Sequence, residues 1–128
     1  MAYKTEQEQF WAGDFGDSYS DRNDSESLLF SKVAMWSKML RSANNVTSVL
    51  ELGCNIGLNL VALKKLQPAL SLKGYEINRK AAKRAEKQGV ADIVTGSILE
   101  KISNDKFDLT FTAGVLIHIN PEFLHCVY

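Results

Sequence analysis

Residues 49–57, Val-Leu-Glu-Leu-Gly-Cys-Asn-Ile-Gly, constrain the fold of this chain more than any other stretch. An apolar run enters a glycine turn and a helical pattern follows, while Glu76 ends a second apolar run nineteen residues past Gly57. Glycine lets a backbone approach a ligand that a Cβ atom would repel. A carboxylate about 20 residues later is where nucleotide-binding α/β units hold ribose hydroxyls. The spacing therefore predicts a site for an adenosine-containing cofactor.

Strand and helix patterns alternate along the remainder of the chain. We expect strands at 47–52, 70–77, 91–95 and 107–112, and helices at 57–66, 79–88 and from residue 120 onward, with Asn120 as the cap of the last helix. This alternation predicts an α/β fold, a Rossmann-like, doubly wound parallel sheet with right-handed crossovers.

The N-terminal third has a different pattern. Capping-box spellings at Thr5 and Asn23 predict helices over 5–12 and from about 23 to 41, separated by a loop over 13–23. We divide the chain into an N-terminal helical segment or lid, 1–44, and a partial cofactor-binding domain, 45–128. A complete doubly wound sheet needs more strands than these, so we expect the chain to be a fragment truncated after the fourth strand.

The composition limits the binding partners and the cellular compartment that we expect for this protein. The formal net charge is zero, which argues against recruitment to nucleic acid or to acidic membranes, and the basic cluster in 79–87 is typical of a solvated helix face. The two cysteines, Cys54 and Cys126, fit neither a disulfide framework nor a metal site. No apolar run is long enough for a membrane span, and the acidic N-terminus is unlike a signal peptide. We therefore expect a cytoplasmic protein without a metal.

The carboxyl ends of parallel strands meet at one crevice, where open α/β sheets bind ligands. The candidate cofactor-binding residues that follow the four expected strands are Glu51, Gly53, Cys54, Asn55 and Gly57, then Glu76 and Ile77, then Ser97 and Ile98, and finally Ala113 and Gly114. Their convergence is stronger support for a binding site than any one motif.

The spelling of the glycine turn separates two classes of cofactor. Read from Gly53, the dinucleotide pattern G-x-G-x-x-G finds Asn55 and Leu58 where glycines should stand, which disfavours NAD or FAD. Residues 51–57 instead resemble the E/D-x-G-x-G-x-G turn of class I S-adenosylmethionine-dependent methyltransferases, with Asn55 replacing the middle glycine. Asparagine tolerates the left-handed backbone better than other non-glycine residues, so the turn can survive this replacement.

Two further segments narrow the resemblance. Residues 5–19 with 22–23, and residues 114–121, are similar to segments of the pseudaminic acid biosynthesis-associated methylases. This resemblance covers nearly the whole chain. It implies a bacterial-type methyltransferase linked to surface-sugar synthesis, which uses S-adenosylmethionine and acts on a small metabolite, such as a sugar or nucleotide-sugar.

The resemblance also implies roles for the crevice residues. A carboxylate has two oxygens for two adjacent hydroxyl donors, so Glu76 should hold the ribose. Gly53 and Gly57 should admit the methionine portion, whose ammonium Glu51 should face directly or through water. The alternative for Glu51 is a buried acid that caps local amides. Ile77 and Ile98 should enclose adenine, although both also suit a core. Ser97 stands where many relatives carry an acid that reads the adenine amino group.

Outside the strand ends, three residues are candidates for the site. An imidazole can accept a proton near neutral pH, so His118 is a candidate general base, with a structural role beside the cofactor as the alternative. Tyr19 and Arg22 would reach over the site, with Arg22 pairing with the cofactor carboxylate, or else form a surface tyrosine and an exposed ion pair. Trp11 should anchor the N-terminal segment, and Cys54 is expected to pack in the turn rather than act as a nucleophile.

The sequence thus favours an S-adenosylmethionine-dependent methyltransferase. Two alternatives stay open: a truncated module that binds the cofactor without transferring its methyl group, and a disfavoured NAD(P)-dependent oxidoreductase.

Overall fold

A parallel sheet carries the glycine turn at one end. The computed structural model describes residues 3–22, 26–100 and 105–128, and the side chains of residues 21 and 22 lie outside the description. Within these residues the strands are β1 (Ser48–Leu52), β2 (Ser71–Glu76), β3 (Asp92–Thr95) and β4 (Leu109–Phe111), in the order β3-β2-β1-β4. All neighbouring pairs are parallel, with Glu51 beside Gly74 and Phe111. The predicted α/β fold is confirmed, and each predicted strand contains an observed one.

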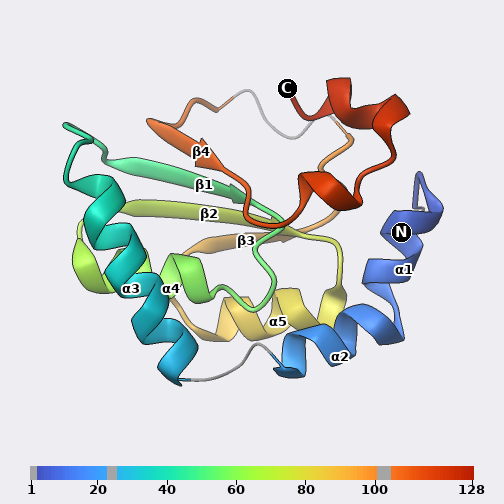
Figure 1. Cartoon of the computed structure of the whole chain (residues 1–128), viewed down its shortest axis with the longest axis horizontal. Coiled ribbons are helices and arrows are strands. Elements are labelled where there is room, and N and C mark those ends of the chain that lie inside the picture. The colour runs from blue at the N-terminus through green and yellow to red at the C-terminus, as the bar shows by residue number, and fades with distance from the viewer. Residues whose placement is uncertain (1–2, 23–25, 101–104) are drawn as a thin grey trace.

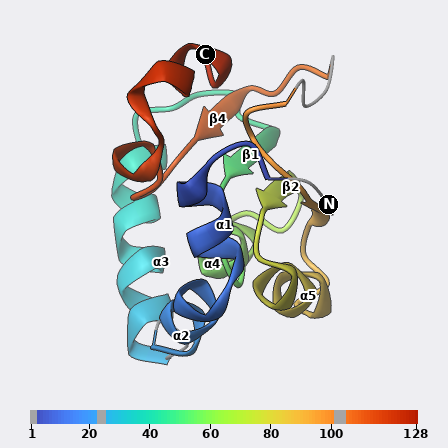
Figure 2. The same ribbon diagram turned by 90° about the vertical axis from the view of Figure 1, so that its right-hand side faces the viewer.

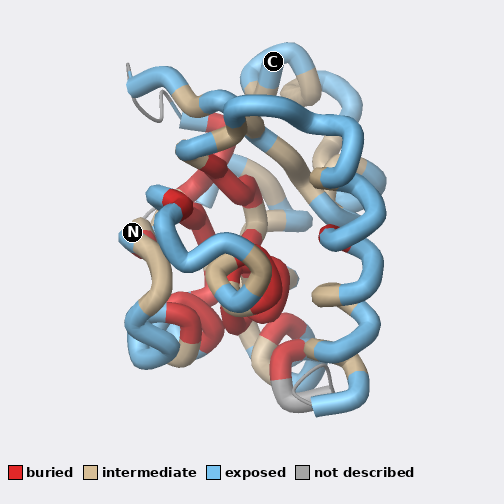
Figure 3. Tube along the Cα trace, turned by 90° about the vertical axis from the view of Figure 1, so that its left-hand side faces the viewer, coloured by how far each residue is buried: buried red, intermediate tan, exposed pale blue. Residues whose placement is uncertain are grey.

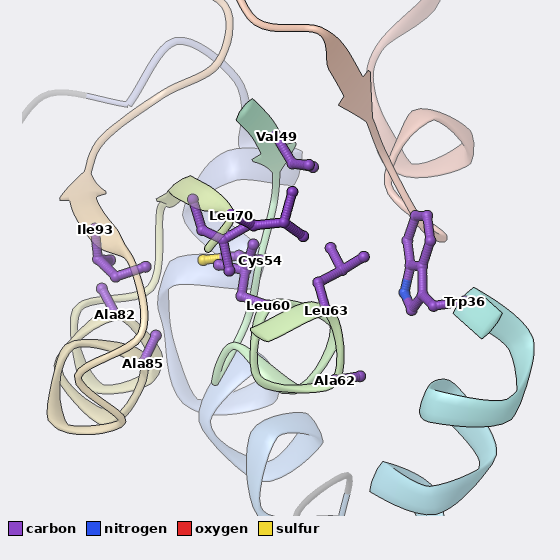
Figure 4. Packing of buried hydrophobic residues seen from close by; sticks show 11 residues of the cluster. Trp36, Val49, Cys54, Leu60, Ala62, Leu63, Leu70, Ala82, Ala85 and Ile93 are labelled. Atoms are coloured by element: carbon purple, nitrogen blue, oxygen red, sulfur yellow. The ribbon is translucent and has the colours of Figure 1, made fainter. Parts of the chain in front are cut away.

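Three helices cover one face of the sheet, as Figure 1 shows. They are α3 (Glu26–Leu40), α4 (Leu58–Leu66) and α5 (Arg79–Lys87). The small Ala82 and Ala85 let α5 lie close to β3, while Leu60 and Leu63 of α4 fill the space over β1 and β2 (Figure 4). The most buried segments are α4, the inner face of α5 and the strands β1 and β2 (Figure 3). Removing these apolar side chains from water is the main contribution to the stability of the fold.

The opposite face of the sheet is covered by the C-terminal part of the chain. Leu50, Leu52 and Tyr75 pack there against Ile98 and partly buried residues such as Val115. Two 3₁₀ helices, η1 (Leu116–His118) and η2 (Pro121–Cys126), follow β4 on this side. Asn120 caps η2, its side chain accepting a hydrogen bond from the Glu122 N–H at 3.1 Å. The predicted cap is confirmed, but the segment takes 3₁₀ geometry.

The N-terminal segment forms two short helices beside the carboxyl ends of the strands. They are α1 (Glu6–Ala12), capped by Thr5 as predicted, and α2 (Asp14–Arg22). Figure 2 shows both helices in front of the sheet at this end. The predicted cap at Asn23 lies outside the described residues. No helix among the described residues is both long and apolar enough to cross a membrane.

The predicted loop over 13–23 is wrong for most of its length, because α2 occupies it. Gly16 is the physical reason, since a Cβ atom there would lie 1.7 Å from the Trp11 carbonyl oxygen. The glycine that suggests a loop instead permits α2 to pack tightly on the end of α1. Phe15 and Tyr19 then both contact Trp11, with ring centroids 5.2 Å from it in both cases.

Candidate functional site

One pocket lies at the carboxyl ends of the strands, between the sheet and the N-terminal helices. Eleven of the fourteen predicted site residues line it: Tyr19, Glu51, Gly53, Cys54, Asn55, Glu76, Ile77, Ile98, Ala113, Gly114 and His118. Gly57 and Ser97 are buried and do not line the pocket. The side chain of Arg22 is outside the described residues. The predicted convergence of the four strand ends is therefore a property of the structure.

The glycine turn uses left-handed backbone at alternate positions. The φ angles are +82° at Gly53, +52° at Asn55 and +86° at Gly57. A Cβ atom at Gly53 would come within 2.5 Å of Val115 Cγ2, so this position requires glycine for both its φ and its close packing. Asn55 adopts the left-handed conformation, as the sequence predicted. Gly57 shapes the turn and abuts Ala85, rather than contributing a pocket wall.

Glu76 is held at the end of β2 by backbone amides. Its Oε1 accepts a hydrogen bond from the Asn55 N–H at 2.7 Å, and its Oε2 accepts one from the Asn78 N–H at 2.8 Å. Burial raises the pKa of the Glu76 carboxyl, while these backbone hydrogen bonds act in the opposite direction. Each carboxylate oxygen has a second lone pair, so Glu76 retains acceptor capacity toward the pocket.

Glu51 is the most deeply buried acid at the site, with 1% of its surface exposed. Its Oε2 accepts a hydrogen bond from Asn59 Nδ2 at 3.0 Å. Its Oε1 is the buried side-chain polar atom that lacks a hydrogen-bond partner within the described residues. Burial raises the pKa of this carboxyl to about 8, against the Asn59 hydrogen bond and the nearby Lys32 charge. An unpartnered buried oxygen that lines a pocket suits a ligand that donates a hydrogen bond.

The N-terminal helices are fixed over the pocket by polar contacts. The buried Asn78 places its amide nitrogen 2.7 Å from Asp17 Oδ1 and 3.1 Å from the Trp11 carbonyl oxygen, while its Oδ1 caps α5 by accepting from the Ala81 N–H. The Lys80 ammonium lies 3.2 Å from Asp17 Oδ2. The Asn78 hydrogen bond and the Lys80 ammonium hold the pKa of the Asp17 carboxyl below its ordinary value.

A second polar contact joins α2 to the glycine turn. The Ser20 hydroxyl lies 2.6 Å from Asn55 Oδ1 and 3.0 Å from the Gly16 carbonyl oxygen. The side chain of Asn55, which stands in place of the middle glycine, therefore helps to hold α2 over the pocket. This contact gives Asn55 a role beyond backbone tolerance.

His118 lies in η1, on the β4 side of the pocket. Its ring centroid is 4.7 Å from that of Trp11, with the planes tilted by 56°. Trp11 also contacts Phe10, Phe15 and Tyr19, in keeping with its expected role as a hydrophobic anchor of the N-terminal segment. The pocket thus has an aromatic wall at this side.

Two other expectations concern buried residues. Cys54 is 4% exposed and burial raises the pKa of its thiol, which opposes formation of a nucleophilic thiolate. Ser97 Oγ accepts a hydrogen bond from the Leu99 N–H at 3.0 Å, so its hydroxyl stabilises the turn after β3. The described residues contain no cluster of histidine, cysteine and acidic side chains suited to a metal.

Sequence reasoning missed several polar residues of the site, among them Lys32, Asn59 and Ser20, and it missed the side-chain role of Asn78. Lys32 and Asn59 line the pocket and share a contact, because Lys32 Nζ lies 3.3 Å from Asn59 Oδ1. A signal was present for Asn59, since a polar residue faces inward from a helix whose neighbours Leu58 and Leu60 are buried. The sequence gave no indication of Lys32 as a site residue, because a lysine in this helix is typical of a solvent-exposed helix face.

Comparisons with known proteins establish the fold. No protein-family model matches the chain, and no curated protein matches it in sequence. Three solved structures resemble it: the plantazolicin methyltransferase BpumL with a triazolic desmethylPZN analog and SAH (S-adenosylhomocysteine), the magnesium protoporphyrin IX methyltransferase ChlM from Synechocystis PCC 6803 with bound SAM, and the N-terminal domain of EvdMO1 with SAH bound.

The similarity lies in the fold rather than in the residues. Identities are 22%, 15% and 24%, the alignments cover 94%, 99% and 69% of this chain, and the TM-scores are 0.69, 0.71 and 0.62. The same alignments cover 50%, 71% and 40% of the three solved chains, and the chain spans no more than half of each plantazolicin methyltransferase chain that it matches. The chain has the Rossmann-like fold of the class I S-adenosylmethionine-dependent methyltransferases.

Proposed function

We propose that this protein is an S-adenosylmethionine-dependent methyltransferase that acts on a small-molecule acceptor. The observation that carries the proposal is Glu51 Oε1, a buried acceptor without a partner, in the same pocket as the strand-end carboxylate of Glu76. A cofactor that combines an ammonium with a ribose diol suits these two acids. The cofactor-bound methyltransferases that share the fold support this choice.

The pocket residues suit the successive parts of this cofactor. Glu76 would receive the ribose hydroxyls, and Ile77 and Ile98 would enclose the adenine. Gly53 would lie beside the methionine portion, and Glu51 would receive the ammonium. Lys32 brings a cation to the same pocket and is our candidate for the carboxylate, in place of the undescribed Arg22 side chain.

Catalysis would depend mainly on alignment and on exclusion of water. When bound, S-adenosylmethionine supplies an electrophilic methyl group on its sulfonium. The chain would hold the acceptor beside it, between the ends of β4 and the N-terminal segment, which we propose acts as a lid (residues 1–44) over the domain formed by 45–128. His118 and Trp11 line this side of the pocket. His118 is the candidate proton acceptor for an acceptor hydroxyl or amine.

The acceptor class is proposed from the sequence resemblance. A sugar or nucleotide-sugar would fit a bacterial-type enzyme of surface-glycan synthesis, and Trp11 with Tyr19 would offer aromatic surface to it. We propose a cytoplasmic location, which the two free cysteines support. Labelled methyl transfer to a panel of nucleotide-sugars tests this acceptor class. Transfer to another small molecule, with none to any sugar, would exclude it.

Calorimetry with S-adenosylmethionine and SAH tests the cofactor assignment. The wild-type chain should bind both, and Glu76→Ala should weaken both by about a hundredfold, because a buried acceptor of two hydroxyls is lost. Glu86→Gln, at an exposed position of α5, is the matched control and should bind as wild type does. Failure of the wild-type chain to bind, or equal binding by Glu76→Ala, would contradict the assignment.

The competing possibility is a module that binds the cofactor without transferring its methyl group. Methyl transfer by this chain would exclude it. Cofactor binding without transfer to any acceptor in the panel would favour it. A change in NADH fluorescence on mixing would instead favour the disfavoured oxidoreductase.

A further inference from the structure

A buried line of polar side chains connects α3 to the floor of the pocket. Trp36 Nε1 donates a hydrogen bond to Asn59 Oδ1 at 3.1 Å, and Asn59 Nδ2 donates one to Glu51 Oε2 at 3.0 Å. Trp36, Asn59 and Glu51 are 3%, 6% and 1% exposed, so water does not substitute for these contacts. Figure 4 shows Trp36 on α3, at the edge of the core. Three separate elements, α3, α4 and β1, each contribute one residue to the line.

The donors at one end fix the orientation of the Asn59 amide. An indole N–H and a lysine ammonium can only donate, and both Trp36 Nε1 and Lys32 Nζ approach the same end of this amide, at 3.1 Å and 3.3 Å. Rotating the amide by half a turn would place its NH2 group against the N–H donors of Trp36 and Lys32. It would also place its oxygen against the Glu51 carboxylate. Asn59 therefore presents its N–H group to Glu51.

This orientation decides which oxygen of Glu51 remains available. Oε2 is occupied by Asn59, and Oε1 stays without a partner while Glu51 lines the pocket. A buried carboxylate that is anchored at one oxygen has little freedom to turn, so its second oxygen is preorganised for a ligand. The residue that sets this arrangement, Trp36, does not line the pocket.

We propose that Trp36 and Asn59 are positioning residues that hold Glu51 Oε1 for the ammonium of the cofactor's amino-acid portion. The inference rests on the proposed function and adds to it a structural cause for recognition of that portion. Trp36 acts through Asn59, and Asn59 acts through Glu51. Lys32 contributes the second donor to Asn59 and reaches the pocket itself.

Two ligands separate this role from a general effect on folding. SAH carries the amino-acid portion, whereas 5′-methylthioadenosine has the same adenosine and thioether without it. Trp36→Phe keeps a ring against Phe111, which lies 4.6 Å away between ring centroids, and removes the N–H donor. We expect this variant to bind SAH about five- to tenfold more weakly and 5′-methylthioadenosine within about twofold of wild type.

Phe111→Leu is the matched control. It loosens the packing of the same indole and leaves its N–H free to donate to Asn59. Its ratio of SAH affinity to 5′-methylthioadenosine affinity should equal that of wild type. In a Glu51→Gln background, Trp36→Phe should change SAH affinity by less than about twofold, because the group that it positions is gone.

Asn59→Asp gives an independent check if Trp36→Phe fails to fold. Its oxygens still accept from Trp36 and Lys32, but it offers no N–H to Glu51, so SAH binding should fall and 5′-methylthioadenosine binding should not. Equal loss of both ligands in both variants, or loss of neither, would overturn the positioning role while leaving the proposed function intact. A wild-type chain that binds neither ligand would overturn the proposed function, and the inference with it.

Discussion

The amide nitrogen of Asn78 lies 2.7 Å from Asp17 Oδ1, and the oxygen of the same amide accepts from the Ala81 N–H at 2.9 Å. One side chain therefore caps α5 and holds α2 over the strand ends. Because its two ends have opposite hydrogen-bonding character, the two functions can be separated by substitution.

Asn78→Asp should release the N-terminal helices and keep the α5 cap. The new carboxylate still accepts from Ala81 but faces Asp17 without a donor. We expect faster cleavage within residues 3–22 by a non-specific protease, measured by mass spectrometry. Asn78→Ala should be equally cleavable and should lose about 1 kcal/mol more in the free energy of unfolding, because the cap is also gone. Unchanged cleavage in both variants would show that Asn78 does not hold the N-terminal helices in place.

Gly53→Ala should destabilise the fold more than Gly89→Ala does. Both positions have positive φ, +82° and +69°, so alanine costs about 1 kcal/mol of backbone strain at either. Only at Gly53 would the new Cβ atom also meet Val115, at 2.5 Å, whereas nothing lies within 4 Å at Gly89. We expect a further loss of about 1–3 kcal/mol at Gly53 in urea unfolding. Equal losses of unfolding free energy in the two variants would show that Val115 shifts to accommodate the added methyl group.

The carboxyl of Glu51 should make the stability of the ligand-free protein depend on pH. Its pKa is raised from 4.5 to about 8 by burial and by Glu76, against the Asn59 hydrogen bond and the Lys32 charge. The folded chain thus keeps a proton that the unfolded chain releases. The resulting stabilisation is complete below about pH 4.5 and is lost as the pH rises toward 8.

Comparison with Glu51→Gln isolates this contribution. Relative to that variant, wild type should lose on the order of 5 kcal/mol in the free energy of unfolding across the pH interval. Glu86→Gln, at an exposed position, should follow the wild-type curve. Parallel curves for wild type and Glu51→Gln would show that the carboxyl is not buried as described.

Binding of SAH should release a proton near pH 7. The ligand ammonium favours the Glu51 carboxylate over the protonated form that the free protein holds, so the proton leaves as the ligand enters. Calorimetry in two buffers of different ionisation enthalpy measures the number released. Release should approach one proton for wild type and be absent for Glu51→Gln and for 5′-methylthioadenosine. Equal release by the Gln variant would assign the proton to another group.

The two cysteines should differ in reactivity. Cys126 is exposed, whereas Cys54 is buried and burial raises the pKa of its thiol. The folded protein should therefore take up one iodoacetamide group, at Cys126, and the unfolded protein two. Peptide mapping after alkylation locates the modified residue. Fast modification of Cys54 in the folded protein would contradict the closed packing of the turn.

The strands and their turn were predictable because their signals are local. Apolar runs, the caps at Thr5 and Asn120, and the left-handed tolerance of Asn55 depend on near neighbours in sequence, and the structure confirms them. The alternation of these elements then determines which strand ends converge. Most of the predicted residues that line the pocket followed from this convergence.

The parts that could not be predicted depend on distant contacts. Gly16 and Asp17 look like loop residues until Trp11 and Asn78 are placed beside them. Likewise, Trp36 reads as an ordinary core residue of a helix, and only the fold brings its N–H to Asn59, 23 residues away. Polar partners far apart in sequence leave no periodic signal.

The hydrogen bond from the Asn55 N–H to Glu76 has a consequence for the kind of ligand that the turn admits. Left-handed turns with free amides form concave anion cradles, and phosphates settle in them. Here the protein's own acid already occupies that cradle. A pyrophosphate would lose the donor and meet a like charge, whereas a positively charged sulfonium would meet no such repulsion. At this amide the turn therefore suits a cationic group better than a pyrophosphate.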